Sequence, residues 1–489
     1  MRHDDRHARH RLRRRAAPFA RALRGGARAA GRQALPDHRA RDDGPDHGGR
    51  GGRTRRCGRR GDPRRLGPRR KYEYTGAVRH LERCAPAGIP DGAGRPAAAH
   101  LPVKRAAIIV LDGVGIGPAP DTAAYGDEGS DTLGNVARAV GGFRLPNLER
   151  LGLGLCRPLR GLSASIRPSA AYGVALPRSK GKDSTTGHWE ICGVLLKKPF
   201  RTYPNGFPTS LLDDFARRTG RGYLGNKAAS GTAIIAELGA EQQRTGQWIV
   251  YTSADSVFQV AAHEETVPPE ELYRACEVAR ELLVGEHAVS RVIARPFTGM
   301  PGAYQRTPHR RDFSLPPVGA TLLDRLAEAG IERVGIGKVD DLFAGRGIAS
   351  EHTPTNRDAY RLIEQALDRG RGGFIFVNVI EFDQTWGHRN DVAGFHEGLL
   401  ELDAWIPRLE GRVREDDLII ITADHGNDPT TPSTDHSREA VPVLVLGPRV
   451  RARGLGERAT FADLGATVAE YFGVGRLGAG TSFLKDVWA

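Results

Sequence analysis

Six short runs of apolar residues recur after residue 105, and glycine or acidic residues follow most of them. They lie at 106–111, 248–252, 333–336, 373–380, 417–422 and 441–446. Continuous Val, Ile and Leu runs of this length are typical of strands covered on both faces, as in a parallel sheet. Helical patterns lie between them, at 268–283 and 459–472. The alternation predicts an α/β fold with a mostly parallel sheet flanked by helices.

The first fifth of the chain has a different composition from the rest. Residues 1–104 hold 28 basic and 10 acidic side chains and only ten Leu, Ile, Val or Phe, whereas the other 385 residues have a net charge of −4. Such a segment cannot bury enough apolar surface to offset the entropy of ordering it. We therefore expect residues 1–103 to be a disordered Arg/Gly/Pro-rich extension. Its charge would allow nucleic-acid binding, but the lack of interleaved aromatic residues favours an extension without that role.

Two features of the sequence narrow the class of protein. No run of 18 apolar residues is present, so a membrane-spanning helix is not expected. The five cysteines form no CxxC pair, which argues against a disulfide scaffold or a zinc finger. We expect a protein of a reducing cytoplasm.

Aspartate and histidine residues follow three of the predicted strands. They are Asp112 after 106–111, Asp383 and His388 after 373–380, and Asp424, His425 and His436 after 417–422. Ligands bind outside the carboxyl ends of strands in open α/β sheets, so we expect these side chains to meet at one edge. Three carboxylates and three imidazoles suit two divalent ions with three protein ligands each, and the mixed donor set admits manganese or zinc.

The loop GKDSTTGHWE, residues 181–190, offers a nucleophile. It contains three adjacent hydroxyls, on Ser184, Thr185 and Thr186. A hydroxyl bound to a divalent ion loses its proton more easily and can attack phosphorus. The spacing alone does not choose among the three.

Several long strings together resemble the phosphopentomutase family of the alkaline phosphatase superfamily. They are VLDGVGIGPAPD, GSDTLGN, GKDSTTGHWE, FDQTWGHR and ITADHGNDPTTPSTDH. The resemblance runs from about residue 104 to the C-terminus and includes none of the first 103 residues. It implies an alkaline-phosphatase-like core at 104–199 and 317–489 and an inserted α+β cap, the substrate domain, at 200–316. It also implies a cytoplasmic isomerase of nucleoside catabolism, an intramolecular phosphotransferase that interconverts ribose 1-phosphate and ribose 5-phosphate, and the 2-deoxyribose pair, through a phosphoenzyme.

The resemblance also assigns residues. Asp383, His388 and His436 would bind one manganese ion, and Asp112, Asp424 and His425 the other. The phosphorylated hydroxyl would be that of Ser184, where the family usually has threonine, and Thr185 remains a competitor. Pentose phosphates would contact Ser253, Asp255, Val257, Arg291, Ile293 and Arg306 of the cap and Lys338 of the core, and a sugar bisphosphate would be the activator. Arginine and lysine suit such phosphates by bidentate or point-charge contacts.

Two alternatives share parts of this pattern. Residues 156–160, CRPLR, match the CxPxR motif of sulfatases and make Cys156 a second candidate nucleophile, but the Thr-Gly that usually follows is missing. Another phosphomutase or phosphatase of the superfamily would use the same two-metal chemistry. The strings YTSADSVFQVAAHEE and RVIARPF in the inserted segment argue against this second alternative, and the sulfatase interpretation leaves the GKDSTTGHWE loop unexplained.

Overall fold

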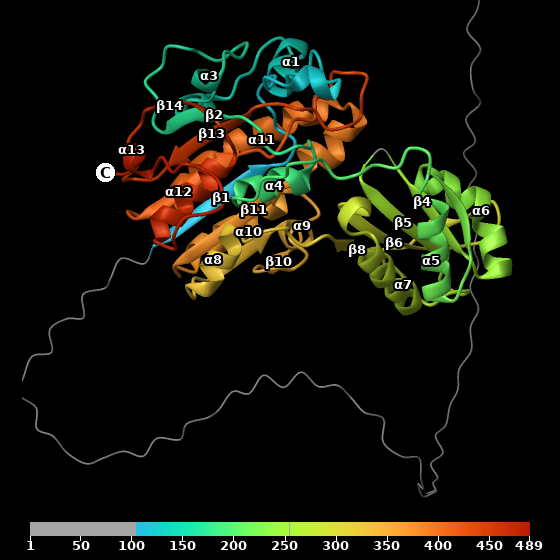
Figure 1. Ribbon diagram of the computed structural model, residues 1–489. Helices are drawn as coiled ribbons and strands as arrows, with labels where there is room; N and C mark the ends of the chain where they lie inside the picture. The colour runs from blue at the N-terminus through green and yellow to red at the C-terminus, as the bar shows by residue number, and fades with distance from the viewer. Residues whose placement is uncertain (1–103, 254) are drawn as a thin grey trace, which may run out of the picture. The chain divides into compact units, whose positions relative to one another are not determined.

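The computed structural model describes residues 104–253 and 255–489, so the predicted extension at 1–103 lies outside the described residues. The described chain is built on two β-sheets (Figure 1). The larger sheet has eight strands in the order β10-β9-β11-β1-β12-β13-β2-β14. Their bounds are β1 Arg105–Leu111, β2 Ala171–Ala175, β9 Arg333–Ile336, β10 Ser350–Glu351, β11 Gly373–Val379, β12 Asp417–Thr422, β13 Val441–Leu446 and β14 Gly454–Arg458.

Five of the six apolar runs form strands of this sheet, as the sequence predicts. Strands β10, β9, β11, β1 and β12 run parallel to one another, and β13 runs antiparallel to both β12 and β2. Every residue of β1, β11, β12 and β13 is buried, because helices cover both faces of the sheet. The predicted fold class, α/β with a mostly parallel sheet, is confirmed.

The helices around the larger sheet make contacts within two groups. One group comprises α4 Ser184–Ile191, α8 Leu322–Glu328, α9 Val339–Leu342 and α12 Ala462–Phe472. The other comprises α1 Thr132–Ala139, α2 Pro146–Leu151, α10 Asn356–Asp368 and α11 Val392–Glu410. The short helices α3 Leu153–Cys156 and α13 Leu484–Val487 lie against β2 and α12, respectively.

The smaller sheet, which we call the cap sheet, is formed by residues between 223 and 314. Its strand order is β3-β4-β5-β6-β7, and β8 pairs with β6. The bounds are β3 Tyr223–Ala228, β4 Trp248–Thr252, β5 Val257–His263, β6 Arg291–Thr298, β7 Gln305–Arg306 and β8 Arg311–Ser314. Helices α5 Thr209–Thr219, α6 Gly231–Thr245 and α7 Pro269–Leu282 belong to the same part of the chain (Figure 1).

The two faces of the cap sheet form separate apolar clusters. Trp248, Val250 and Phe258 pack with residues of α5 and α7 on one face. Ile249 and Tyr251 pack with Ile234 and Ile235 of α6 on the other face. Alternate residues of a strand point to opposite faces, so α6 covers the face that carries Tyr251.

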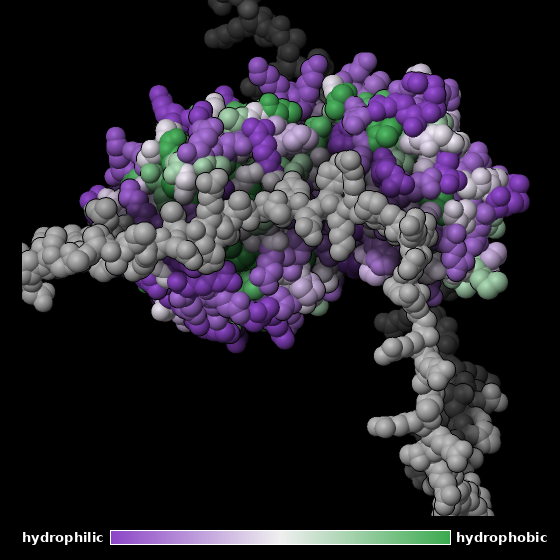
Figure 2. All heavy atoms as spheres, turned by 90° about the horizontal axis from the view of Figure 1, so that it is seen from below, coloured by the Kyte–Doolittle hydropathy of each residue, from purple (hydrophilic) through white to green (hydrophobic). Residues whose placement is uncertain are grey.

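On the face seen in Figure 2, the visible surface of the described residues is mostly hydrophilic, with small, scattered hydrophobic areas. Among residues 104–253 and 255–489, no helix has the length and apolar character needed to cross a bilayer.

A buried ion pair joins the beginnings of two central strands. The guanidinium of Arg105, at the start of β1, forms a two-contact ion pair with Asp417, at the start of β12. Both side chains are almost fully buried, and Asp417 also accepts a hydrogen bond from the backbone N–H of Arg414 at 2.7 Å. Loss of one partner would leave a buried charge without its counter-ion.

We therefore predict that Asp417→Asn lowers the free energy of unfolding by about 3–5 kcal/mol. The neighbouring Asp416 provides a matched control, because its ion pair with Arg449 is partly exposed. Asp416→Asn should cost no more than about 1 kcal/mol. Urea unfolding of the two variants measures both values, and equal losses would contradict the prediction.

Candidate active site

The carboxyl ends of the three central strands bring the acidic residues together. Strands β11, β1 and β12 are adjacent and in level register, with Leu111 beside Val379 and Val110 beside Thr422. Asp112 follows β1 directly, and Asp424 follows β12 by two residues. Asp383 lies after β11, in the short π-helix Phe382–Trp386. Each of the three aspartates is 3% exposed or less.

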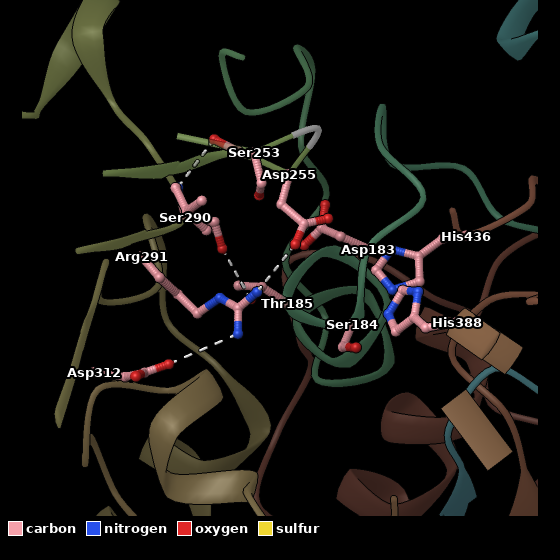
Figure 3. A network of polar contacts seen from close by, with 12 residues as sticks. Asp183, Ser184, Thr185, Ser253, Asp255, Ser290, Arg291, Asp312, His388 and His436 are labelled. Atoms are coloured by element: carbon pink, nitrogen blue, oxygen red, sulfur yellow. Dashed lines mark hydrogen bonds and ion pairs between the residues drawn. The ribbon is translucent and has the colours of Figure 1, made fainter. Parts of the chain in front are cut away.

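All six residues assigned as metal ligands lie in this one place. Ligand-type atoms of Asp112, Asp424 and His425 lie within 4.8 Å of one another, and so do those of Asp383, His425 and His436. His388 is at the side of the second group. Its Nε2 is 3.3 Å from Oδ2 of Asp383, and its ring centre is 4.8 Å from that of His436 (Figure 3).

An isolated antiparallel β-bridge between Gly426 and Ser437 brings His436 close to the other candidate ligands. The backbone N–H of Gly426 donates to the carbonyl of Ser437 at 3.0 Å, and the N–H of Ser437 donates back at 2.7 Å. His425 and His436 precede the two bridged residues, so the bridge holds the two imidazoles 4.3 Å apart, centre to centre.

The site concentrates negative charge that cations must balance. Burial raises the pKa of Asp383, but the imidazoles of His436 and His388 outweigh burial and hold that pKa well below the ordinary carboxyl value. Burial lowers the pKa of His425, but the carboxylates of Asp424, Asp112 and Asp383 raise it to about 10. The buried Oδ2 of Asp424 accepts no hydrogen bond from a described residue. Buried carboxylates mixed with imidazoles are a donor set that divalent metal ions fit.

Of the three adjacent hydroxyls, Ser184 is the one that lies against the ligand cluster. It is the first residue of α4, and Oγ of Ser184 lies 3.2 Å from Oδ1 of Asp112 and 3.1 Å from Nε2 of His425. Thr185 instead accepts a hydrogen bond from Ser290 at 3.1 Å (Figure 3). Oγ1 of Thr186 donates to the N-cap carboxylate of Asp183 at 2.6 Å.

A close approach of α4 to β12 fixes this position. A Cβ atom on Gly187 would lie 2.2 Å from the carbonyl oxygen of Asp424. Only glycine allows the helix to pass so near the strand end, and the following turn of α4 then places His188 with its Nδ1 3.0 Å from Oδ2 of Asp424. The helix therefore delivers a hydroxyl to the carboxylate of Asp112 and an imidazole to the carboxylate of Asp424.

The sequence analysis missed residues that orient the ligands. Besides His188, these include Asn427, whose Nδ2 donates to Oδ1 of Asp383 at 2.7 Å. Glu439 is fully buried and accepts hydrogen bonds from Gly117, Thr132 and Ser437. His188 and Asn427 lie in the quoted strings GKDSTTGHWE and ITADHGNDPTTPSTDH, and Glu439 follows the second string by three residues. Their closeness in sequence to proposed ligands could have pointed to them. However, which neighbouring side chain points toward the ligands depends on the local path of the backbone.

The predicted substrate residues line one cavity of about 1450 Å³ together with Ser184, Asp383, His388 and His436. They are Ser253, Asp255, Val257, Arg291, Ile293, Arg306 and Lys338. Nζ of Lys338 lies 2.7 Å from Oδ2 of Asp112. Arg291 lies between two carboxylates, with distances of 3.8 Å to Asp255 and 3.7 Å to Asp312 (Figure 3).

Comparisons with known proteins identify the family of this chain. The family model described as the metalloenzyme superfamily matches residues 104–476. The phosphopentomutase of Carboxydothermus hydrogenoformans is 56% identical over 387 residues, which is 79% of this chain and 100% of that protein. The phosphopentomutase of Anaeromyxobacter dehalogenans strain 2CP-C is 56% identical over 386 residues, which is 78% of this chain and 98% of that protein.

The chain belongs to the phosphopentomutase family. Among solved structures it is also similar to the phosphoglycerate mutase of Leishmania mexicana, with a TM-score of 0.38 and 15% identity over 78% of this chain and 97% of that one. Membership confirms the predicted isomerase class and the alkaline-phosphatase-like fold. Together with the clusters of candidate ligands, it identifies a divalent-metal centre.

The alternative nucleophile Cys156 does not fit the family's site. Cys156 is at the end of α3 and packs against the larger core, and it does not line the cavity that contains Ser184. Burial raises the pKa of its thiol to about 12. A thiol in such surroundings is not ionised at neutral pH and is a poor nucleophile.

We predict that Asp383→Asn lowers metal binding, because Asp383 belongs to one of the two ligand groups and contacts both His388 and His436. The loss of affinity should exceed the roughly 10–100-fold that removal of a ligand's hydrogen-bond partner costs. Elemental analysis after dialysis against limiting metal measures it. Glu237→Gln is the control, since this carboxylate pairs with Lys227 on the surface. Equal metal content in the two variants would contradict the assignment.

Proposed function

We propose that this enzyme interconverts ribose 1-phosphate and ribose 5-phosphate, and the 2-deoxyribose pair, through phosphorylated Ser184. The observation that carries the proposal is the position of the Ser184 hydroxyl. It lies against Asp112 and His425 and borders a cavity whose cap side carries cationic side chains. A hydroxyl beside a metal centre and opposite cations is suited to exchange a phosphoryl group with a bound sugar phosphate.

We assign two manganese ions to the centre. Asp383, His388 and His436 would hold one, and Asp112, Asp424 and His425 the other. When bound, the ions supply positive charge that favours the ionised hydroxyl and the charged phosphoryl oxygens. The buried carboxylates, the short approach of Asn427 to Asp383 and the contact of His188 with Asp424 support this assignment, because such partners orient ligands.

The phosphoryl transfer needs no reactant other than the phosphorylated enzyme and the sugar phosphate. A free sugar hydroxyl forms a bond to the phosphorus of phosphorylated Ser184, the bond from phosphorus to Oγ breaks, and the proton of the sugar hydroxyl ends on Oγ. The product of this half-reaction is a sugar 1,5-bisphosphate. Transfer of its other phosphoryl group back to Oγ completes the isomerisation without net release of phosphate. A sugar bisphosphate is accordingly the proposed activator, because it can transfer a phosphoryl group to unphosphorylated Ser184.

The cap residues would bind and orient the sugar phosphate. Arg291 and Lys338 bring positive charge to the same cavity as Ser184 and would attract the phosphoryl oxygens. Ser253 and Asp255 offer oxygens to the sugar hydroxyls. The hydrogen bond from Ser290 to Thr185 joins the beginning of β6 to α4, which supports a sugar site beside the nucleophile.

Replacement of Ser184 tests the phosphoenzyme directly. Ser184→Ala should lower kcat by about 10³-fold or more, because no hydroxyl remains to accept the phosphoryl group. Ser184→Thr should retain activity, since it keeps the same oxygen. Intact-mass and peptide spectrometry of the protein incubated with the bisphosphate should show one phosphate, on Ser184. Phosphate on Thr185, or full activity of Ser184→Ala, would contradict the assignment.

A comparison of two reactions separates a mutase from a phosphatase of the same superfamily. With ribose 1-phosphate, we expect conversion to ribose 5-phosphate without a matching release of inorganic phosphate. With p-nitrophenyl phosphate, we expect no steady release of phosphate. Steady release from both compounds would favour a phosphatase. Cys156→Ala serves as the control and should leave the isomerisation unchanged, whereas its inactivation would favour the sulfatase alternative.

A further inference from the structure

The cations that line the cavity fall into two groups. Lys338 and Arg291 have carboxylate partners near the metal ligands, as described above. Arg310 also has one, because it makes two contacts of 2.7 Å with Asp312. By contrast, no carboxylate of the described residues lies within ion-pair distance of Arg295 or Arg306, although both line the cavity. The guanidinium groups of Arg295 and Arg306 thus border the cavity without a carboxylate partner among the described residues.

Strand geometry places Arg295 on the face of the cap sheet that carries Tyr251 and helix α6. Residues 291, 293 and 295 of β6 alternate with buried neighbours, so Arg291, Ile293 and Arg295 point to one face. Gln259 is opposite Ile293, and Nε of Arg295 donates to its Oε1 at 3.2 Å. Four residues of strand separate Arg295 from Arg291, about 13 Å at roughly 3.3 Å per residue. Arg295 is therefore well separated along the strand from the contacts of Arg291.

The surroundings of Arg295 disfavour its positive charge. Burial, together with the nearby Arg310 and Arg306, lowers the pKa of Arg295 to about 10, although Tyr251 and Asp312 act in the opposite direction. Its only hydrogen-bond partner among the described residues is the neutral amide of Gln259. An anion would relieve both the burial and the repulsion.

The beginning of helix α6 meets these arginines. Ser230 caps the 15-residue helix, and Ser230 and Gly231 line the cavity. A Cβ atom on Gly231 would lie 2.2 Å from Nη2 of Arg306 and 2.6 Å from Oη of Tyr251. Glycine therefore lets a guanidinium and a phenol reach the first turn of the helix, where free N–H groups and the helix dipole favour negative charge.

Besides the two arginines, the phenol of Tyr251 also indicates that a ligand binds here. Its side chain is 1% exposed, and its Oη has no hydrogen-bond partner among the described residues. A buried hydroxyl without a partner is costly. This hydroxyl is beside Gly231, at the end of the helix where an anion would be held.

We propose that the cap carries a phosphate-binding site formed by Arg295, Arg306, the hydroxyl of Tyr251 and the N-terminus of α6. It is separate from the place where Ser184 exchanges its phosphoryl group. The ligand is a phosphate group, either the one on a bound sugar phosphate that is not being transferred or a free phosphate ion. The first source rests on the proposed function, whereas binding of inorganic phosphate does not require turnover.

Equilibrium dialysis of the manganese-loaded full chain with inorganic phosphate tests the site. Arg295→Gln should weaken one phosphate-binding step by at least about tenfold, because it removes a charge-assisted contact. Tyr251→Phe should weaken the same step by about threefold or more, and Arg295→Lys should restore part of the loss. The control is Arg244→Gln, which removes the same charge at the opposite end of α6, on an exposed side chain. Wild-type binding in both Arg295→Gln and Tyr251→Phe would overturn the proposal.

Steady-state kinetics distinguish the two sources of the phosphate. If the sugar supplies it, Arg295→Gln should raise the KM for ribose 5-phosphate at least tenfold with little change in kcat, and inorganic phosphate should inhibit competitively. If a free ion is the ligand, KM should be unchanged, and the effect of added phosphate on the rate should be non-competitive and absent in the variant. Loss of phosphate binding in Arg295→Gln supports the site whether or not the wild-type enzyme is active toward pentose phosphates. Normal binding refutes it without affecting the proposed function.

Discussion

The repulsion among three buried carboxylates is the constraint on which the rest of the site depends. Parallel pairing of β11, β1 and β12 brings Asp383, Asp112 and Asp424 to one edge with almost no exposure to water. Buried like charges are tolerated only when cations balance them. Within the protein, His425, whose pKa is raised, and Lys338, which contacts Asp112, supply part of this positive charge. A divalent-metal centre is the arrangement that satisfies it with the donors present.

The same constraint explains why the nucleophile lies at the start of a helix. Ser184 can face Asp112 and His425 only if α4 passes close to the end of β12, and Gly187 permits that approach. The N-cap carboxylate of Asp183 secures the first turn and binds Thr186, while Ser290 binds Thr185. Each of the three neighbouring hydroxyls thus has a different partner, and one of them faces the ligand cluster.

Much of the core could be predicted from the sequence because its signals are local. Five apolar runs became strands of the larger sheet, and the segments 268–283 and 459–472 contain α7 and α12. The aspartates could be placed at one sheet edge because parallel strands end at the same side. Arg295 was missed although it is two residues from Ile293 and four from Arg291 on a strand, where a period of two puts all three on one face. The orienting residues His188 and Asn427 were missed because their directions depend on turns that the sequence does not specify.

The sequence by itself determined the class of fold, the family and the donor types of the metal site, since strand patterns and long motif strings depend on residue order alone. Only the tertiary structure decided which hydroxyl of 184–186 faces the ligands, which carboxylates are buried together and where the cations of the cap gather. Those outcomes depend on distances between segments far apart in the sequence, such as those that contain Asp112 and Asp424. Such distances are set by strand order, helix packing and close approaches at glycine, and no local pattern encodes them.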